Sequence, residues 1–470
     1  MSSDPAATEP IDPTIWKVVG VVSIGPFLSQ MDSTLVNVSL STIGQTLHAS
    51  IATAQWVVSA YLLAMALMLP LNGWLVDRVG AKRVYLFCFG AFTVASVICG
   101  VAQSMGELIA ARIVQGLIGG IMAPMAQMMI GRVAGRHIEK VMGFAALPLL
   151  LAPVFGPVLA GGILVHASWP WLFFINVPIG ALGVVMAARL LPADTDAVQA
   201  RPFDLLGFAL VSPGLVALID GLQNASRAEG RGLALAGMVL LSAFGWHSIR
   251  NGRAGKAPLI DVRIFAKPRF AVPAMTQCLA NAVLYGRQLV VPLFLIVGCG
   301  LSAAHAGSLL AATGVGMMCT FPLLGRLTER LGCRGVAAGG ALLALLGALP
   351  FVYMAGHHFH FALAVVSLFL AGAGQGMIGV PSVSAAYAAI PKNQLAVANT
   401  ALNIVQRIGG PLATTLLSMT IASSATAAHP FAPVDASHFA WAFLVLVAMH
   451  LLCVLAAMGL PVRVQRPNRD

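Results

Sequence analysis

The sequence carries very little charge for its length. Of its 470 residues only 9% are Asp, Glu, Lys or Arg, whereas 59% are hydrophobic and the mean hydropathy is +0.88. A soluble domain carries about 25% charged residues, so this composition argues against an ordinary soluble globular protein. A chain this long and this apolar is typical of a polytopic membrane protein.

Several motifs that would indicate other chemistry are also missing. The seven cysteines form no CxxC pair and most lie in apolar runs, which argues against a disulfide framework or a zinc site. The histidine-rich segment 357–360 has no acidic neighbour, so we predict no metal site there, and no cofactor for the chain. No G-x-x-x-x-G-K-[ST] loop is present, which disfavours ATP as the energy source.

Apolar runs of about twenty residues, the length that spans a bilayer as a helix, repeat along the chain. We therefore predict an all-α polytopic membrane protein with fourteen spans. The glycine-containing run 360–388 fits either one long span or two short ones. The runs cover residues 16–40, 52–73, 84–103, 106–129, 140–164, 171–191, 203–222, 232–249, 269–297, 304–325, 334–355, 360–388, 396–422 and 438–460.

Lys and Arg are distributed unevenly between the loops. With the N-terminus inside, 22 of the 27 basic residues fall in inner loops and tails, and only Arg227 and Arg231 fall in outer loops. This asymmetry predicts a multi-pass protein of the inner (plasma) membrane with both termini cytoplasmic. The net charge of +11 then forms a belt that faces anionic lipid, and we expect no nucleic-acid partner.

Two loops that lie eight spans apart share one sequence pattern. GWLVDRVGAKR (73–83) and GRLTERLGCRG (325–335) both fit G-x-L-x-[Asp/Glu]-Arg-x-Gly-x-[Lys/Arg]. Such a repeat marks equivalent positions in duplicated halves, which is the architecture of secondary transporters. We predict a disordered cytoplasmic tail over 1–15, a six-helix bundle over 16–196, two inserted helices over 197–262, a second six-helix bundle over 263–460 and a basic tail over 461–470.

A charged residue, Asp32, lies inside the first apolar run. A charge at the centre of a bilayer costs about 3 kcal/mol or more and is usually functional. Gly25, Ser29 and Asp32 recur at i, i+4 and i+7, which places Asp32 on a stripe that faces the bundle, and Asn37 is expected to extend its polar face. At 1.5 Å per residue, Asp32 and Arg112 of the fourth run lie about 12 Å and about 9 Å below the same edge.

Such a pair suits proton coupling. Burial raises the pKa of a carboxyl group and a nearby arginine lowers it, so an aspartate balanced between them can bind and release a proton as its access to water changes. We hypothesise that Asp32 carries the proton and that Arg112 tunes it. A structural salt bridge between the first and fourth spans is the alternative.

Further segments resemble the major facilitator superfamily, and specifically its fourteen-span drug/proton antiporter branch. ARIVQGLIGG (111–120) and PVFGPVLAGG (153–162) resemble the motifs of the fourth and fifth spans, and SWPWLFFINVPIG (168–180) resembles the segment that follows. MDSTLVNVSL (31–40), PLIDVRIF (258–265) and NIVQRIGG (403–410) are also similar to that branch, so the resemblance covers nearly the whole chain. The sequence departs from the branch at Ser41, where a Pro is usual, at Pro170, where an Arg is usual, and near Ile296, where a Gln is frequent.

The resemblance implies roles for particular residues. In the family the repeated loop latches the bundles in one state, and the fifth-span motif is a kink that favours exchange over leak. A solvated loop and plain glycine packing are the respective alternatives. The latch residues would be Gly73, Asp77, Arg78, Gly80, Lys82, Arg83, Gly325, Glu329 and Arg330, and the kink residues would be Pro153, Gly156, Pro157, Gly161 and Gly162.

Arg287 and Arg407 lie in mid-span with no obvious acid beside them. We expect them either to face a water-filled cavity and bind an anionic group or to pair with backbone carbonyls. The predicted cavity or substrate residues are Asn37, Gln115, Arg287, Asn403 and Arg407.

We therefore predict a proton-coupled exporter of small amphipathic compounds that works by alternating access. Its expected partners are protons, a small-molecule substrate and membrane lipid, with a periplasmic adaptor protein as a further candidate. An exporter of one specific metabolite or antibiotic is the alternative. A membrane enzyme such as an acyl- or glycosyltransferase would need clustered catalytic side chains at one membrane face, and the outer loops hold few acids, so we predict no enzyme.

Overall fold

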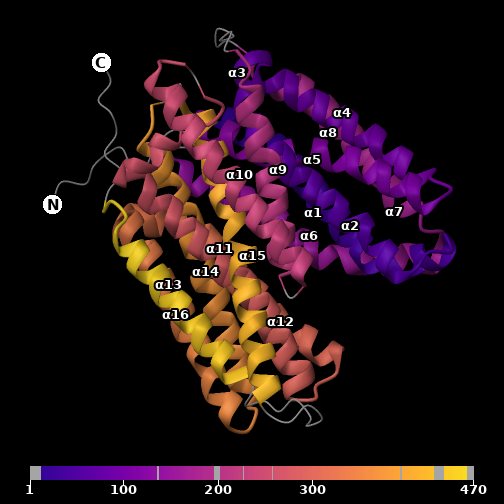
Figure 1. The fold of residues 1–470 in the computed structure, drawn as a ribbon, viewed down its shortest axis with the longest axis vertical. Helices are drawn as coiled ribbons and strands as arrows, with labels where there is room; N and C mark the ends of the chain where they lie inside the picture. The colour runs from indigo at the N-terminus through magenta and orange to yellow at the C-terminus, as the bar shows by residue number, and fades with distance from the viewer. Residues whose placement is uncertain are drawn as a thin grey trace. The chain divides into compact units, whose positions relative to one another are not determined.

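The fold is entirely helical. The computed structural model describes residues 12–134, 137–194, 202–225, 227–256, 258–391, 394–427 and 439–462, and these contain helices and turns but no strand. The predicted all-α class is therefore confirmed. By their contacts the residues form two compact units, Met1–Met68 with Leu75–Ala200, and Leu69–Trp74 with Arg201–Asp470. Figure 1 shows the helices of each unit, which are described separately.

The first unit is built mainly on six helices that pack against one another. Helix α2 packs against α5, α1 packs against α6, and α4 packs against both α5 and α8. The first residues of α3 belong to the second unit. The helices are α1 (Pro13–Thr46), α2 (Ile51–Met68), α3 (Asn72–Val79), α4 (Ala81–Gly100), α5 (Met105–Ala134), α6 (Ile138–His166), α7 (Trp171–Phe174) and α8 (Asn176–Leu190).

The second unit contains the remaining helices, including the two that were predicted as an insertion. These two, α9 and α10, pack against each other, and α13 packs against α14 and α16, as Figure 1 shows. Helix α11 packs against α15. The helices are α9 (Leu205–Gln223), α10 (Ala228–Arg253), α11 (Pro268–Leu293), α12 (Ala303–Thr320), α13 (Leu324–Gly356), α14 (Phe361–Ala388), α15 (Leu395–Ala427) and α16 (Ala440–Met458).

Each of the fourteen predicted runs lies on helical structure. The ambiguous run 360–388 is a single helix, α14. Within the described ranges, ten helical stretches are long and apolar enough to cross a membrane, and one of them, His305–Gly356, covers two predicted runs. The count of fourteen spans therefore stays a prediction. Many large apolar side chains of these helices are exposed, Val239 and Trp441 among them, as expected where lipid is the solvent.

Small residues bring α5 very close to α2. The glycines Gly116 and Gly120 form a G-x-x-x-G pair on α5, and both are buried. A Cβ atom at Gly116 would collide with the backbone carbonyl of Tyr61, and one at Gly120 with the backbone of Met65. Such glycines allow helix backbones to approach closely, which is a common way for helices to associate in membranes.

The repeated loop has the same backbone form in both of its copies. A short 3₁₀ helix, Leu69–Leu71 in one copy and Phe321–Leu323 in the other, precedes each loop. The second glycine of each pattern, Gly80 or Gly332, then adopts a positive φ of 96° or 74°. Only glycine adopts this conformation without strain, so the pattern requires glycine at both positions.

The basic residue that follows each of these glycines closes a contact that the sequence pattern did not reveal. Lys82 Nζ donates to the carbonyl of Leu191 at 2.7 Å, and Arg334 Nε donates to the carbonyl of Leu460 at 2.7 Å. Each leucine lies one or two residues after the last helix of its predicted six-helix bundle, α8 or α16, and is followed by a proline. We call these two contacts the helix-end clasps.

A carboxylate strengthens the clasp in the first unit. Asp194 accepts hydrogen bonds from the backbone nitrogens of Lys82 at 2.9 Å and Arg83 at 3.3 Å. These nitrogens lie in the first turn of α4, where a helix leaves N–H groups unpaired and its dipole favours negative charge. The clasp therefore connects the start of α4 to the chain that follows α8.

Asp204 organises the start of the two-helix insertion. Its Oδ1 accepts from the Gly207 nitrogen at 2.9 Å and lies 2.9 Å from His247 Nε2, and its Oδ2 accepts from the Leu259 nitrogen at 3.1 Å. Burial works against the charged form, but the hydrogen bonds from His247, Gly207 and Leu259 outweigh it and hold the pKa of Asp204 below its usual 3.8. The carboxylate thus joins α9, α10 and the segment before α11.

We expect Asp204→Ala to lower the free energy of unfolding at neutral pH by about 1–2 kcal/mol, because a helix cap and two further hydrogen bonds are lost. A lowered folded-state pKa means that the charged carboxylate stabilises the fold above pH 3.8 and stops doing so as the pH falls through the lower folded value. The difference in melting temperature from the wild type should therefore be full at pH 7 and shrink below pH 3.8. Asp261→Ala, which breaks a surface pair with Arg263, is the control and should shift the melting temperature less. Equal shifts for both variants would contradict the assignment.

Candidate functional site

The structure brings Asp32 and Arg112 into contact. Asp32 lies on α1 and Arg112 on α5, and Arg112 Nη1 lies 2.5 Å from Asp32 Oδ2. Both side chains are fully buried, with 0% exposure. A buried pair of opposite charges inside an apolar helix bundle is expensive to form and is therefore a candidate functional site.

The stripe predicted on α1 directs Asp32 into the first unit. Gly25, Ser29 and Asp32 are all buried. Ser29 Oγ lies 2.7 Å from the hydroxyl of Tyr61 on α2, and a Cβ atom at Gly25 would collide with Tyr85 of α4. The small side chains of this face therefore let α1 approach its neighbours until Asp32 reaches α5.

Three polar side chains complete the surroundings of the pair. Asn176 Nδ2 donates to Asp32 Oδ1 at 2.7 Å, and Gln115 Nε2 donates to the same oxygen at 3.3 Å. Ser96 Oγ accepts from Gln115 Nε2 at 2.8 Å and from Asn176 Nδ2 at 3.3 Å. We call Asp32, Ser96, Arg112, Gln115 and Asn176 the polar cluster; its members come from α1, α4, α5 and α8.

Arg112 is fixed by more than its carboxylate. Its Nε donates to the carbonyl of Val57 at 3.1 Å, its Nη1 also donates to Gln115 Oε1 at 2.5 Å, and its guanidinium lies 3.9 Å from the ring centroid of Tyr61. Cation–π contact and a backbone acceptor keep the guanidinium in place. Arg112 Nη2 and Asn176 Oδ1 are buried and have no hydrogen-bond partner among the residues that the structure describes.

This geometry makes protonation of Asp32 a large perturbation. A protonated Asp32 would no longer neutralise Arg112, and removing one charge of a buried pair costs about 3–5 kcal/mol. A change of that size is sufficient to shift an equilibrium between two conformations by a factor of about 10²–10³. The polar cluster therefore contains a buried charge pair whose disruption is energetically large, and none of its five members is a nucleophile with an adjacent base.

Sequence reasoning found part of the polar cluster and missed the rest. It identified Asp32 and Arg112 as a candidate pair and Gln115 as a cavity residue, but it did not identify Ser96 or Asn176. Asn176 belongs to the INVP segment quoted above, where a buried amide in an apolar context was the available signal. Ser96 carries no comparable signal, because small hydroxyl residues are common in apolar helices.

The other predicted cavity residues lie outside the polar cluster. Asn37 is exposed, which corrects the expectation that it extends the face of Asp32: five residues along a helix turn it about 140° away. Arg287 is buried on α11, Asn403 donates to the carbonyl of Asn399 at 2.9 Å on α15, and Arg407 is half-buried on the same helix. Those three belong to the second unit.

The predicted kink and latch residues are placed as follows. Gly156 lies against Thr34 of α1, whereas Gly161 and Gly162 have open space around them, so close packing is seen at only one of the three glycines. Pro153 and Pro157 lie outside the described side chains.

Among the latch residues, Gly73 and Gly325 are buried, and Gly73 lies beside α15 of its own unit. Asp77 is half-buried. Gly80 and Lys82, like Gly332 of the second copy, are described with the repeated loop above. The exposed members are Arg78, Arg83, Glu329 and Arg330.

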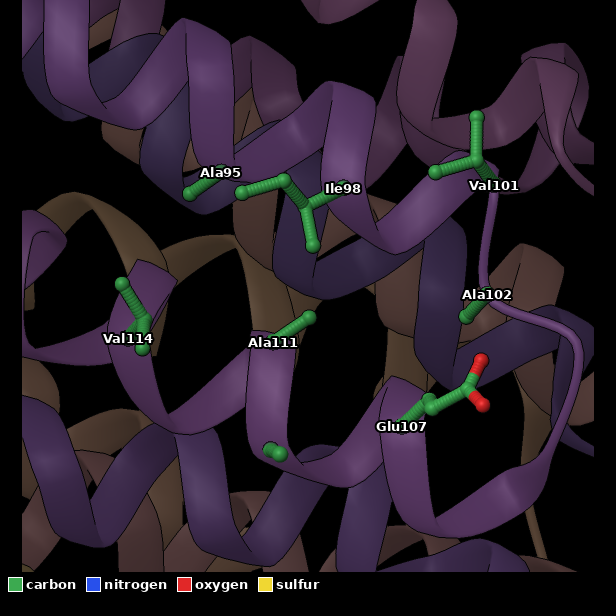
Figure 2. A pocket seen from close by; sticks show the side chains of 8 residues that line it. Ala95, Ile98, Val101, Ala102, Glu107, Ala111 and Val114 are labelled. Atoms are coloured by element: carbon green, nitrogen blue, oxygen red, sulfur yellow. The ribbon is translucent and has the colours of Figure 1, made fainter.

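A groove of about 340 Å³ lies between α4 and α5. Figure 2 shows Ala95 and Ile98 on one wall, Ala111 and Val114 on the other, and Glu107 at one end. The groove is lined almost wholly by apolar side chains, and Ile98 and Val114 are exposed. It lies on the surface of these helices, whereas Ser96, Arg112 and Gln115 are buried, so the groove is separate from the polar cluster.

Comparison with known proteins identifies relatives of the chain. The family model of the Major Facilitator Superfamily matches residues 22–414. The chain is 30% identical over 417 residues to "Multidrug resistance protein B homolog" of Mycobacterium tuberculosis (strain ATCC 25618 / H37Rv), which covers 87% of this chain and 76% of that protein. It is 32% identical over 416 residues to "Putative multidrug resistance protein MdtD" of Serratia proteamaculans (strain 568), which covers 86% of this chain and 85% of that protein.

Solved structures share the fold at much lower identity. The proton:xylose symporter XylE superposes with a TM-score of 0.65 at 14% identity, covering 95% of each chain. The human organic anion transporter MFSD10 (TETRAN) superposes with a TM-score of 0.65 at 14% identity, covering 96% of this chain and all of the other. At this identity the likeness shows the fold alone.

Proposed function

Because the chain belongs to the major facilitator superfamily, and is thus a multi-pass membrane transporter and not an enzyme, we propose that it exports small amphipathic compounds in exchange for protons. Relatives named for multidrug resistance support the broad substrate class. An exporter of one metabolite or antibiotic is the second candidate, since relatives at about 30% identity do not fix the substrate. The inner membrane, with both termini cytoplasmic, is the proposed location.

The buried pair of Asp32 and Arg112 is the observation that carries the proposal. In one conformation Arg112 pairs with the carboxylate of Asp32. Proton binding to Asp32 removes that attraction and favours a second conformation, in which Arg112 is neutralised or hydrated in another way. Substrate binds the conformation that proton binding disfavours, so the two ligands exchange across the membrane.

The repeated loops and the fifth-span motif are assigned supporting roles. We assign Asp77 and Arg78 to a latch that favours one conformation. Gly80, Gly332, Lys82 and Arg334 keep the two loops in the shape that the latch requires. The glycine- and proline-rich α6 acts as the antiport kink, supported by the close approach of Gly156 to Thr34. The two six-helix bundles, 16–196 and 263–460, move as the alternating parts, and α9 and α10 link them.

Everted membrane vesicles test the energy source. With ethidium as the probe cation, we expect accumulation in wild-type vesicles that is lost when the proton gradient is collapsed and unchanged when ATP is depleted at a maintained gradient. Vesicles without the protein are the control. Accumulation that survives collapse of the gradient would contradict proton exchange. Accumulation of one compound only, across a panel of amphipathic probes, would favour the dedicated exporter.

A further inference from the structure

A second intramembrane charge, Arg287, forms no ion pair within the part of the second unit that the structure describes. Its side chain is 4% exposed on α11, and both Nη1 and Nη2 are buried with no hydrogen-bond partner among the described residues. Among the described residues of α11 to α16 the only acidic residue is Glu329, which is exposed at the start of α13. A buried guanidinium that lacks both a carboxylate and its hydrogen bonds is strongly disfavoured unless something else binds it.

A histidine of α16, which packs against α11, lies at the same level of the bundle as Arg287. His450 is 1% exposed, and residues on either side of it share apolar clusters with residues on either side of Arg287. His450 Nδ1 lies 2.7 Å from the carbonyl oxygen of Leu446, which can only accept, so Nδ1 carries the proton of the neutral ring. His450 Nε2 therefore presents a lone pair, and it too is buried with no partner in the described part of the chain.

These two residues form a polar layer between two apolar clusters. On one side, Val290 of α11 and Leu446 of α16 belong to a cluster centred on Phe294 and Phe443. On the other side, Ala280 of α11 and Cys453 of α16 belong to a second cluster. Arg287 and His450 interrupt an otherwise continuous apolar core within the span, and stability alone gives no reason for that interruption.

The unpartnered atoms are complementary to a carboxylic acid. The two Nη groups offer parallel donors, the fork that binds both oxygens of a carboxylate. His450 Nε2 offers an acceptor for one proton. A carboxylate together with one proton satisfies all three atoms, whether that proton sits on the carboxyl oxygen or on Nε2.

We propose that Arg287 and His450 form a binding site for weak organic acids in the second unit, one proton being bound with each acid. The proposal deepens the proposed function by adding an acidic class to the substrates. The balance is simple: a carboxylate and a proton from solution enter together, no covalent bond in the ligand forms or breaks, and both leave together.

No other acid competes for the proton at this site. Helix α16 packs against α11, α13 and α15. The titratable or charged side chains that these elements bury are Arg287 of α11, Cys333 of α13 and Cys453 of α16, while Arg407 of α15 is half-buried. None of them is a carboxyl group.

Equilibrium binding by the purified full-length protein in lipid nanodiscs tests the site. Dansylglycine is the carboxylate probe and dansylcadaverine is a cation with the same fluorophore. We expect Arg287→Met to weaken dansylglycine binding by about tenfold or more, the loss of a charge-assisted bidentate contact, and to change dansylcadaverine binding less than twofold. Arg287→Lys, which keeps the charge but not the fork, should lie between. Arg269→Met, at the exposed start of the same helix, is the matched control and should leave both affinities within twofold.

Proton uptake tests the role of His450. Calorimetry of dansylglycine binding in buffers of different ionisation enthalpy should give about one proton taken up per acid bound at pH 7 by the wild type, and much less by His450→Gln. Monodisperse elution and retained dansylcadaverine binding show that each variant is folded. The proposal is overturned if the wild type does not bind dansylglycine, if Arg287→Met weakens both probes equally, or if Arg269→Met has the same effect. Proton uptake that His450→Gln leaves unchanged would remove His450 from the site. Because no transport is required, failure of the vesicle experiment leaves these results independent.

Discussion

Asp32→Asn is expected to reduce proton-driven export to the level of vesicles without the protein. The asparagine cannot take up a proton, and it leaves the buried guanidinium of Arg112 without a counter-charge. Loss of one partner of a buried pair also destabilises the protein by about 3–5 kcal/mol, so the amount of folded protein is measured with each transport rate. Asp220→Asn, at a half-buried aspartate of α9, is the matched control and should transport normally.

A double variant distinguishes proton coupling from a structural salt bridge. Asp32→Asn combined with Arg112→Met removes both charges, and replacing a buried pair by apolar groups is often neutral for stability. If the pair only holds α1 against α5, the double variant regains folding and export together. If Asp32 carries the proton, the double variant regains folding and still fails to export. Restored export in a folded double variant would therefore refute the proposed role of Asp32.

Gly120→Leu is expected to prevent normal folding of the first unit. The Cβ atom of the new side chain would overlap the backbone of Met65. Neither backbone can move away without separating α5 from α2. Overpacking of a close helix contact costs about 3 kcal/mol or more, and here Arg112 would also be displaced from Val57. The yield of monodisperse protein and its melting temperature provide the measurement.

Gly106→Leu is the control for this substitution. Gly106 lies on the same helix with open space around its Cα, so the same side chain meets no neighbour there. We expect wild-type yield and a melting temperature close to that of the wild type. Equal losses at both positions would show that α5 tolerates no leucine for a reason other than its contact with α2.

The helices and the central ion pair could be predicted from the sequence because each depends on local information. An apolar run of sufficient length has to be a helix in lipid, whatever surrounds it. The approach of Asp32 and Arg112 followed from the depth of each residue within its run and from the small residues of α1. Gly80 and Gly332 were found by the repeat, and their positive φ values give its physical reason.

The remaining contacts could not be predicted because they depend on how distant helices pack. Asn176 reaches Asp32 only because the chain turns between α7 and α8, and nothing in the apolar pattern specifies which face of α8 turns inward. Asn37 was expected on the face of Asp32 because the stripe of α1 was extended one residue beyond the helical repeat, and the structure shows Asn37 exposed. His450 gave no signal either, since one histidine in an apolar helix gains meaning only beside Arg287.

The helix-end clasps bear on the order in which the chain acquires its structure during synthesis. Lys82 cannot make its hydrogen bond until Leu191 has been synthesised. The start of α4 likewise lacks its carboxylate acceptor until Asp194 has been synthesised. Asn176, the last member of the polar cluster along the chain, is made shortly before them. Once residue 194 has left the ribosome, the buried ion pair and its clasp can both be complete while the second unit is still being translated. Asp32 and Arg112, the first buried charges along the chain, can therefore neutralise each other before the second unit has been translated.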